Sequence, residues 1–121
     1  MKRRPDIRMT PAEVDAFLAA RRRAVIGTVD AAGAPDGEPV DFAWADGIAT
    51  VAVVRDGPAH RNIQCDTRIV CSLEEFPSYG DIRGVTLHGR AVAVADASAR
   101  VRFRIDAERV ESFDFRKMRQ A

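Results

Sequence analysis

Residues 40–54 read VDFAWADGIATVAVV, and this stretch decides the fold class. Over residues 40–45, large apolar side chains alternate with small or charged ones, which is the period of a strand with one buried face. Asp46-Gly47 is a typical two-residue hairpin sequence, so residues 48–54 return as a second strand. This second strand is apolar on both faces, and we therefore expect it to lie in the middle of an antiparallel sheet.

Strand patterns continue through the rest of the chain. A helix is predicted over residues 11–21, with Thr10 as its N-cap and Glu13 completing a capping box. Asp56-Gly57-Pro58 predicts a short helix that ends near Cys65. The further strands are expected at residues 24–29, 68–73, 82–94, 101–105 and 107–115. One helix followed by six or seven closely connected strands favours a small antiparallel barrel, because closure removes exposed sheet edges.

Length and composition limit the classes of function. The 121 residues suffice for a single domain spanning 1–121, in which we expect residues 1–9 to be a loose arm and 116–121 a polar tail. The formal net charge of +1 argues against nucleic acid as a partner. No apolar run is long enough to cross a membrane, and the start MKRRPDIRMT is not a secretory signal. We therefore expect a cytoplasmic protein whose two cysteines, Cys65 and Cys71, stay reduced.

Catalytic and metal-binding motifs are not evident in the sequence. The two histidines, His60 and His88, and the two cysteines have no spacing typical of a zinc site, so no metal is expected. Cys71 alternates with Ile69 and Leu73 and is interpreted as a core residue. There is no phosphate-binding glycine motif of the P-loop or dinucleotide type.

The remaining candidate binding residues are arginines, of which the chain has 17 against two lysines. In residues 51–63 (VAVVRDGPAHRNI), an apolar strand ends in a glycine-containing turn that begins a short helix, with Arg55 and Arg61 on either side. Helix amides and nearby arginines can bind phosphate, although an ordinary strand-to-helix turn has the same pattern. Arg100, Arg102 and Arg104 form a ladder on one strand face, which is either a solvated face or a binding surface.

The order of these segments resembles the flavin-binding split-barrel superfamily, which includes pyridoxamine 5'-phosphate oxidase-like proteins and deazaflavin (F-420)-dependent oxidoreductases. The stretches that carry the resemblance are MTPAEVDAFLAARRRAVIGTVDAAGAPDGEPVDFAW, AHRNIQCDTRIVCSL, YGDIRGVTLHGRAVAV and VRFRIDAERVESFDFRKM. They cover almost the whole chain. The resemblance implies a mainly β fold, a six- to seven-stranded antiparallel split barrel with an N-terminal helix and one short helix.

The resemblance also implies a homodimer that holds FMN or the deazaflavin coenzyme between its subunits, and the sequence does not separate these two cofactors. Strand residues 51–54 would line the ring, and Phe113 would reach across from the partner subunit. The residues implied to bind the cofactor are Pro39, Val40, Asp41, Val51, Val53, Val54, Arg55, His60, Arg61 and Asn62. No catalytic residue is implied, because the ring performs the hydride chemistry.

Two departures from the family pattern affect the functional hypothesis. Gly57 and Ala59 stand where many relatives carry a serine or arginine and a lysine that hold the phosphate. After Val94, a short turn replaces a helix that walls the substrate side in relatives. The first hypothesis is an oxidoreductase that transfers hydride to or from a small organic substrate. The alternative is a degenerate, non-catalytic dimeric split barrel that binds a flavin-like or other small ligand.

Overall fold

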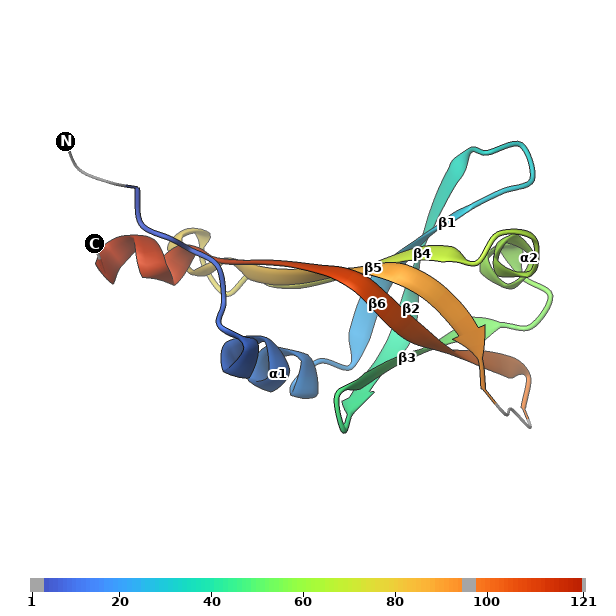
Figure 1. Cartoon of the computed structure of the whole chain (residues 1–121), viewed down its shortest axis with the longest axis horizontal. Helices are drawn as coiled ribbons and strands as arrows, with labels where there is room; N and C mark the ends of the chain where they lie inside the picture. Colours follow the sequence, from blue (N-terminus) through green and yellow to red (C-terminus); the bar gives the residue numbers. More distant parts are fainter. Residues whose placement is uncertain (1–3, 95–97, 121) are drawn as a thin grey trace.

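A computed structural model of the chain describes residues 4–94 and 98–120, and it is shown in Figure 1. Six antiparallel strands form a closed barrel in the order β1-β2-β3-β6-β5-β4. The elements are α1 (Pro11–Ala19), β1 (Arg23–Val29), β2 (Pro35–Ala45), β3 (Ile48–Val54), α2 (Pro58–Cys65), β4 (Arg68–Glu75), the 3-10 turn η1 (Tyr79–Asp81), β5 (Arg83–Ala93), β6 (Arg100–Asp114) and the 3-10 helix η2 (Phe115–Gln120). The mainly β fold class, with an N-terminal helix and one short helix, is confirmed.

The number of strands is six, because the last two predicted strands are one. β6 runs without interruption from Arg100 to Asp114 and pairs with both β3 and β5. Residues 106–108, at the junction of the two predicted strands, lie at a bulge in the ladder between β5 and β6. Pairing continues through a bulge, so the loss of alternation there does not end the strand.

The same bulge requires a glycine. The β5–β6 register shifts between His88 and Gly89, so that Glu108 is the extra residue on β6. A Cβ atom at Gly89 would lie 2.0 Å from the carbonyl oxygen of Asp106. The two backbones therefore approach too closely for any side chain at this position.

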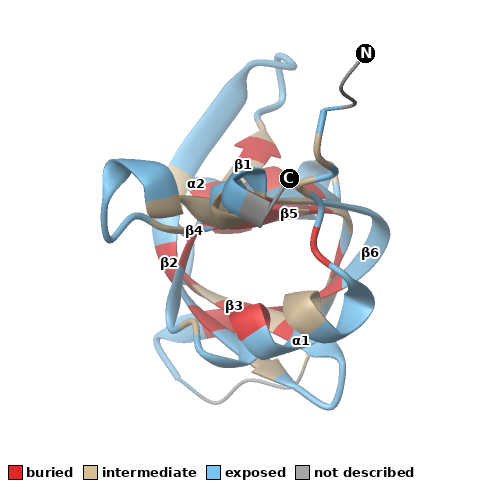
Figure 2. Ribbon diagram, turned by 90° about the vertical axis from the view of Figure 1, so that its left-hand side faces the viewer, coloured by how far each residue is buried: buried red, intermediate tan, exposed pale blue. Residues whose placement is uncertain are grey.

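The core fills the barrel and follows the alternation of the strands. Buried residues alternate with intermediate or exposed ones along the strands, and Figure 2 colours the ribbon by this burial. The helices α1 and α2 lie at opposite ends of the barrel (Figure 1). Phe17 and Leu18 of α1 and Ala59 and Ile63 of α2 are buried in the same apolar core. Each helix therefore covers one end of the barrel.

The predicted N-terminus of α1 is confirmed in detail. The hydroxyl of Thr10 accepts a hydrogen bond from the Glu13 amide at 3.2 Å, and the Glu13 carboxylate accepts one from the Thr10 amide at 2.8 Å. These two bonds are the predicted capping box. The helix ends at Ala19, two residues before the predicted end.

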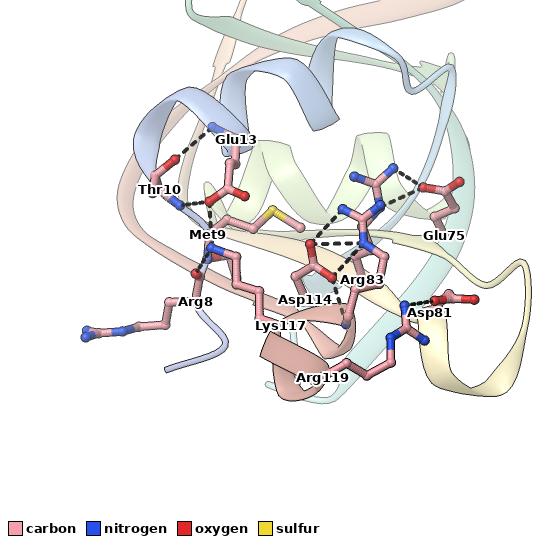
Figure 3. A network of polar contacts seen from close by, with 12 residues as sticks. Arg8, Met9, Thr10, Glu13, Glu75, Asp81, Arg83, Asp114, Lys117 and Arg119 are labelled. Carbon is pink, nitrogen blue, oxygen red and sulfur yellow. Dashed lines mark hydrogen bonds and ion pairs between the residues drawn. The ribbon is translucent and has the colours of Figure 1, made fainter. Parts of the chain in front are cut away.

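The segment before α1 differs from the loose arm that the sequence suggested, because residues 7–9 are bonded to the end of β6. The Ile7 carbonyl accepts from the Asp114 amide at 2.7 Å, and the Met9 amide donates to the Ser112 hydroxyl at 2.9 Å. Met9 is buried. The ammonium group of Lys117 in η2 donates to the Arg8 carbonyl at 2.8 Å and to the Glu13 carboxylate at 2.6 Å (Figure 3).

The predicted polar tail is likewise folded, as the helix η2. The buried carboxylate of Asp114 accepts from the Arg116 guanidinium at 2.7 Å, and the hydrogen bonds from Arg116 hold the pKa of Asp114 below its ordinary value. Arg119 donates to Asp81 at 2.7 Å, which ties η2 to η1 (Figure 3). Ion pairs therefore hold both the beginning of η2, at Arg116, and its end, at Arg119.

Candidate functional site

The apolar residues predicted to line a ring divide between the inside and the outside of the barrel. Val40, Val51 and Val53 are buried at 1–2% exposure, with their side chains in the core. A ligand on the outer surface would meet only their backbone. Pro39 and Val54 are exposed, Val54 to 56%. The outward positions of the same strands, rather than the predicted inward ones, therefore present side chains to solvent.

The outward residues of β2, β3 and β6 form one continuous surface, which we call the outer β2–β3–β6 face. In register across it lie Asp41 of β2, Ala52 of β3 and Arg102 of β6. Its members are Asp41, Ala43, Thr50, Ala52, Val54, Arg100, Arg102 and Arg104. Small side chains occupy the middle of the face and arginines its β6 border.

Asp41 forms ion pairs with two arginines at this face. Its carboxylate accepts from the Arg23 guanidinium at 2.5 Å and from the Arg100 guanidinium at 2.9 Å. All three side chains are about half exposed, so the two ion pairs are solvent-screened. The carboxylate is thus engaged by two cations and is not a free base.

The three arginines of the β6 ladder differ in their partners. Arg100 is paired with Asp41, and Arg104 donates to Asp106 at 2.7 Å, which lowers the pKa of the Asp106 carboxyl. Among the described residues, Arg102 makes no side-chain hydrogen bond or ion pair. Its guanidinium is exposed beside the small side chain of Ala52, so it is the arginine of this face that can receive an anionic ligand.

The residues predicted near a phosphate cluster around α2, but their side chains are largely engaged within the chain. His60 is buried, accepts a hydrogen bond at Nδ1 from the Asp56 amide at 2.9 Å and lies against Phe103. Because Nδ1 accepts, the ring proton is on Nε2. Asn62 is also buried and donates to the Thr28 hydroxyl at 3.0 Å. These two side chains fix α2 on the end of the barrel.

The two arginines beside α2 bind carbonyl groups. Arg55 donates to the Ser98 carbonyl at 3.0 Å, and Arg61 donates to the Asp56 carbonyl. Both arginines lie at the surface. His60, Arg61 and Asn62 thus lie on α2 and Arg55 in the turn before it, and His60 and Asn62 are engaged in structural hydrogen bonds.

The first turn of α2 is hydrogen-bonded to Glu38, a residue that was not predicted from the sequence. The Glu38 carboxylate accepts a hydrogen bond from the Ala59 amide at 3.2 Å. Glu38 shares the inward face of β2 with Val40 and Phe42. Extending the alternation of residues 40–45 by one step towards the N-terminus would have placed this carboxylate at the barrel end.

A second candidate surface lies over β1, β4, β5 and β6 and contains none of the predicted residues. It is a groove of about 660 Å³ with the backbone of Gly27 and the side chain of Val70 among its lining. His88 lines it as well, with Nδ1 at 3.2 Å from the Arg109 guanidinium. The His88 Nε2 atom is 2.8 Å from the Glu111 carboxylate, but the angles are not those of a hydrogen bond.

Other kinds of site find no support in the part of the chain that the structure describes. Within residues 4–94 and 98–120, no group of three or more His, Cys, Asp or Glu side chains is placed to hold a metal ion. Cys71 is fully buried, and burial raises the pKa of its thiol to about 12, so it is not a nucleophile. None of the described helices has the length and apolar character that a transmembrane helix needs.

The closed six-stranded barrel with helices at its ends defines a split-barrel protein, and comparisons with known proteins identify the family. Residues 10–119 match the pyridoxamine 5'-phosphate oxidase family, so the chain belongs to that family and to its flavin-binding split-barrel superfamily. The predicted resemblance is thereby confirmed. No curated protein matches the sequence.

Solved structures share the fold across most of the chain. The conserved hypothetical protein Rv2991 from Mycobacterium tuberculosis has a TM-score of 0.85 at 25% identity, over 98% of this chain and 92% of that one. A FAD-binding protein from Mesorhizobium loti has a TM-score of 0.76 at 16% identity, over 88% of this chain and 96% of that one. A structure described as an F420 reductase has a TM-score of 0.67 at 14% identity, covering 79% and 94%.

Proposed function

We propose that this protein binds FMN or the deazaflavin coenzyme between two copies of the chain and is an oxidoreductase that transfers hydride to or from a small organic substrate. The observation that carries the proposal is the family match over residues 10–119. A neighbour described as FAD-binding and another described as an F420 reductase support a flavin-type ligand without separating the two cofactors.

The outer β2–β3–β6 face fits the ring of such a cofactor. Ala43 and Ala52 present small side chains on this face, over which a planar ring could lie, and Val54 adds an exposed apolar side chain. Arg102 stands at the β6 border and would bind an anionic part of the ligand. A bound flavin or deazaflavin supplies the hydride chemistry, while these residues orient it and exclude water from one side of the ring.

The phosphate position expected at α2 fits less well. Gly57 offers no side chain, and a Cβ atom there would lie 3.1 Å from the Val54 carbonyl oxygen. Ala59 is buried, and its amide is bonded to Glu38. The local packing is therefore consistent with the small residues Gly57 and Ala59 at the two positions where relatives carry phosphate-binding side chains.

A homodimer would complete the site, because the face is open on its outer side. Outside that face, on the neighbouring strands β1 and β4, Val25 and Val70 are exposed to 52% and 37%. Exposed apolar residues on a sheet face are typical of a contact surface. We propose that a second copy covers part of this surface, and that the dimer resides in the cytoplasm with Cys65 and Cys71 as free thiols.

The experiment is a titration of the purified protein with FMN, FAD and F-420, followed by ligand fluorescence, with the oligomeric state measured by light scattering. We expect saturable binding of at least one cofactor with a dissociation constant below about 10 μM, or about −7 kcal/mol, by a dimer. A protein that binds none of the three at 200 μM, or a monomer at all concentrations, would contradict the proposal.

A non-catalytic binding module is the second candidate. It is favoured by the chemistry of the outer β2–β3–β6 face, where Asp41 is held by two arginines and the remaining titratable side chains are arginines. The two candidates differ in turnover. Reduction of the bound cofactor by a nicotinamide or other donor, followed by reoxidation with an organic acceptor, supports the oxidoreductase, whereas binding without either half-reaction supports the module.

A further inference from the structure

Glu38 lies at an unusual position for a carboxylate. It is paired in register with Ile26, a fully buried residue of β1, and shares the inward face of β2. A carboxylate on an inward face needs a donor, because its desolvation is otherwise costly. The donor is the amide of Ala59, in the first turn of α2.

That hydrogen bond occupies one of the few backbone amides that the first turn of α2 could donate to an anion. The first turn of a helix has unpaired amides, which is why anions bind there. The Gly57 amide donates to the Val54 carbonyl at 3.0 Å, Pro58 has no amide hydrogen, and the Ala59 amide donates to Glu38. The amide of His60 is the remaining donor of this turn.

Two carboxylates near this turn offset the positive charge of the two arginines beside it. Glu38 and Asp56 both place carboxylates near it, and the Asp56 side chain is 85% exposed. The two nearby arginines, Arg55 and Arg61, are directed to the carbonyls of Ser98 and Asp56. An incoming phosphate would therefore meet one free amide, two carboxylates and two guanidinium groups that already donate to carbonyls.

We infer that Glu38 acts as a built-in anion that excludes phosphate from the N-terminus of α2, so that a phosphorylated cofactor places its phosphate at Arg102 of β6 instead. The inference rests on the proposed function for its ligand class. Glu38 is a specificity-determining residue, which sets where the anionic end of the ligand binds.

The test uses inorganic phosphate at constant ionic strength and follows the amide resonances of residues 59 and 60 by NMR. In the wild type we expect no saturable shift up to 50 mM phosphate. In E38A and in the nearly isosteric E38Q, we expect saturable shifts at these amides, with affinity increased roughly thirtyfold over the wild type by removal of one charge about 4 Å from a dianion. D36N removes a carboxylate from the same strand outside the hydrogen bond to α2, and it should behave as the wild type does.

Saturable shifts in the wild type would overturn the inference, and so would the absence of shifts in both Glu38 variants. E38Q retains an acceptor for the Ala59 amide and decides the question if E38A does not fold. The flavin titrations are read separately. If FMN, FAD and F-420 all fail to bind while phosphate binds only the Glu38 variants, the proposed function fails and the role of Glu38 stands.

Discussion

Replacement of Gly89 by alanine should destabilise the barrel severely, because of the close approach of β5 and β6 at the bulge. The new Cβ atom would lie 2.0 Å from the Asp106 carbonyl oxygen, about 1.4 Å nearer than the 3.4 Å at which ordinary contacts begin. The obstacle is backbone, so no rotation of a side chain relieves it. Overpacking costs about 1–3 kcal/mol, and each strained ladder hydrogen bond adds about 0.5–1.5 kcal/mol.

We therefore expect Gly89→Ala to lower the free energy of unfolding by about 3–4 kcal/mol, and the melting temperature by about 10–15 °C. Urea denaturation and calorimetry measure both quantities. Gly37→Ala is the matched control, since it is the same substitution within a strand and its Cβ atom meets nothing nearer than 3.8 Å. Its effect should stay within about 1 kcal/mol. A Gly89→Ala variant that melts within 3 °C of the wild type would refute the steric argument.

Three further outcomes are expected. Asp114→Asn should cost about 1–2 kcal/mol at pH 7. Because the folded-state pKa of Asp114 is lowered, that difference should begin to shrink as the pH falls below about 4, the ordinary value for an aspartate, and should be lost as the pH falls through the folded-state pKa; a difference in urea denaturation that stays constant down to pH 2 would contradict it. A thiol reagent at pH 8 should modify one cysteine of the native protein, Cys65, and two after unfolding, since Cys71 is buried with a pKa of about 12; rapid modification of both in the native state would disprove this assignment. Arg102→Gln should weaken FMN binding about tenfold or more relative to riboflavin, while Arg104→Gln, whose guanidinium is paired, should not; equal effects in fluorescence titrations would argue against a phosphate contact at residue 102.

The fold followed from the sequence wherever one face of an element differed from the other. Alternation in residues 40–45 and the capping box at Thr10 placed their elements correctly. Alternation failed at residues 106–108, because a bulge shifts the phase of the side chains while the ladder continues. The docking of residues 7–9 was missed as well, since it depends on backbone bonds to a strand that lies a hundred residues later.

The candidate site was less predictable, for a related reason. Apart from Thr50, β3 is apolar at every position, so its sequence carries little information about which residues face outward. Val51 and Val53 consequently entered the prediction although their side chains lie in the core. The partner of the Ala59 amide, Glu38, comes from another strand, and such a contact depends on the relative placement of two elements that no local pattern encodes.

The pairing of β6 with both β3 and β5 has a consequence for biosynthesis. Until residues 100–114 have left the ribosome, β3, β2, β1, β4 and β5 can form only an open sheet with two bare edges. Such edges pair readily with other chains. The nascent polypeptide is therefore prone to aggregate until β6 has emerged, and its solubility at that stage depends on how quickly this strand closes the barrel or on a chaperone that shields the gap.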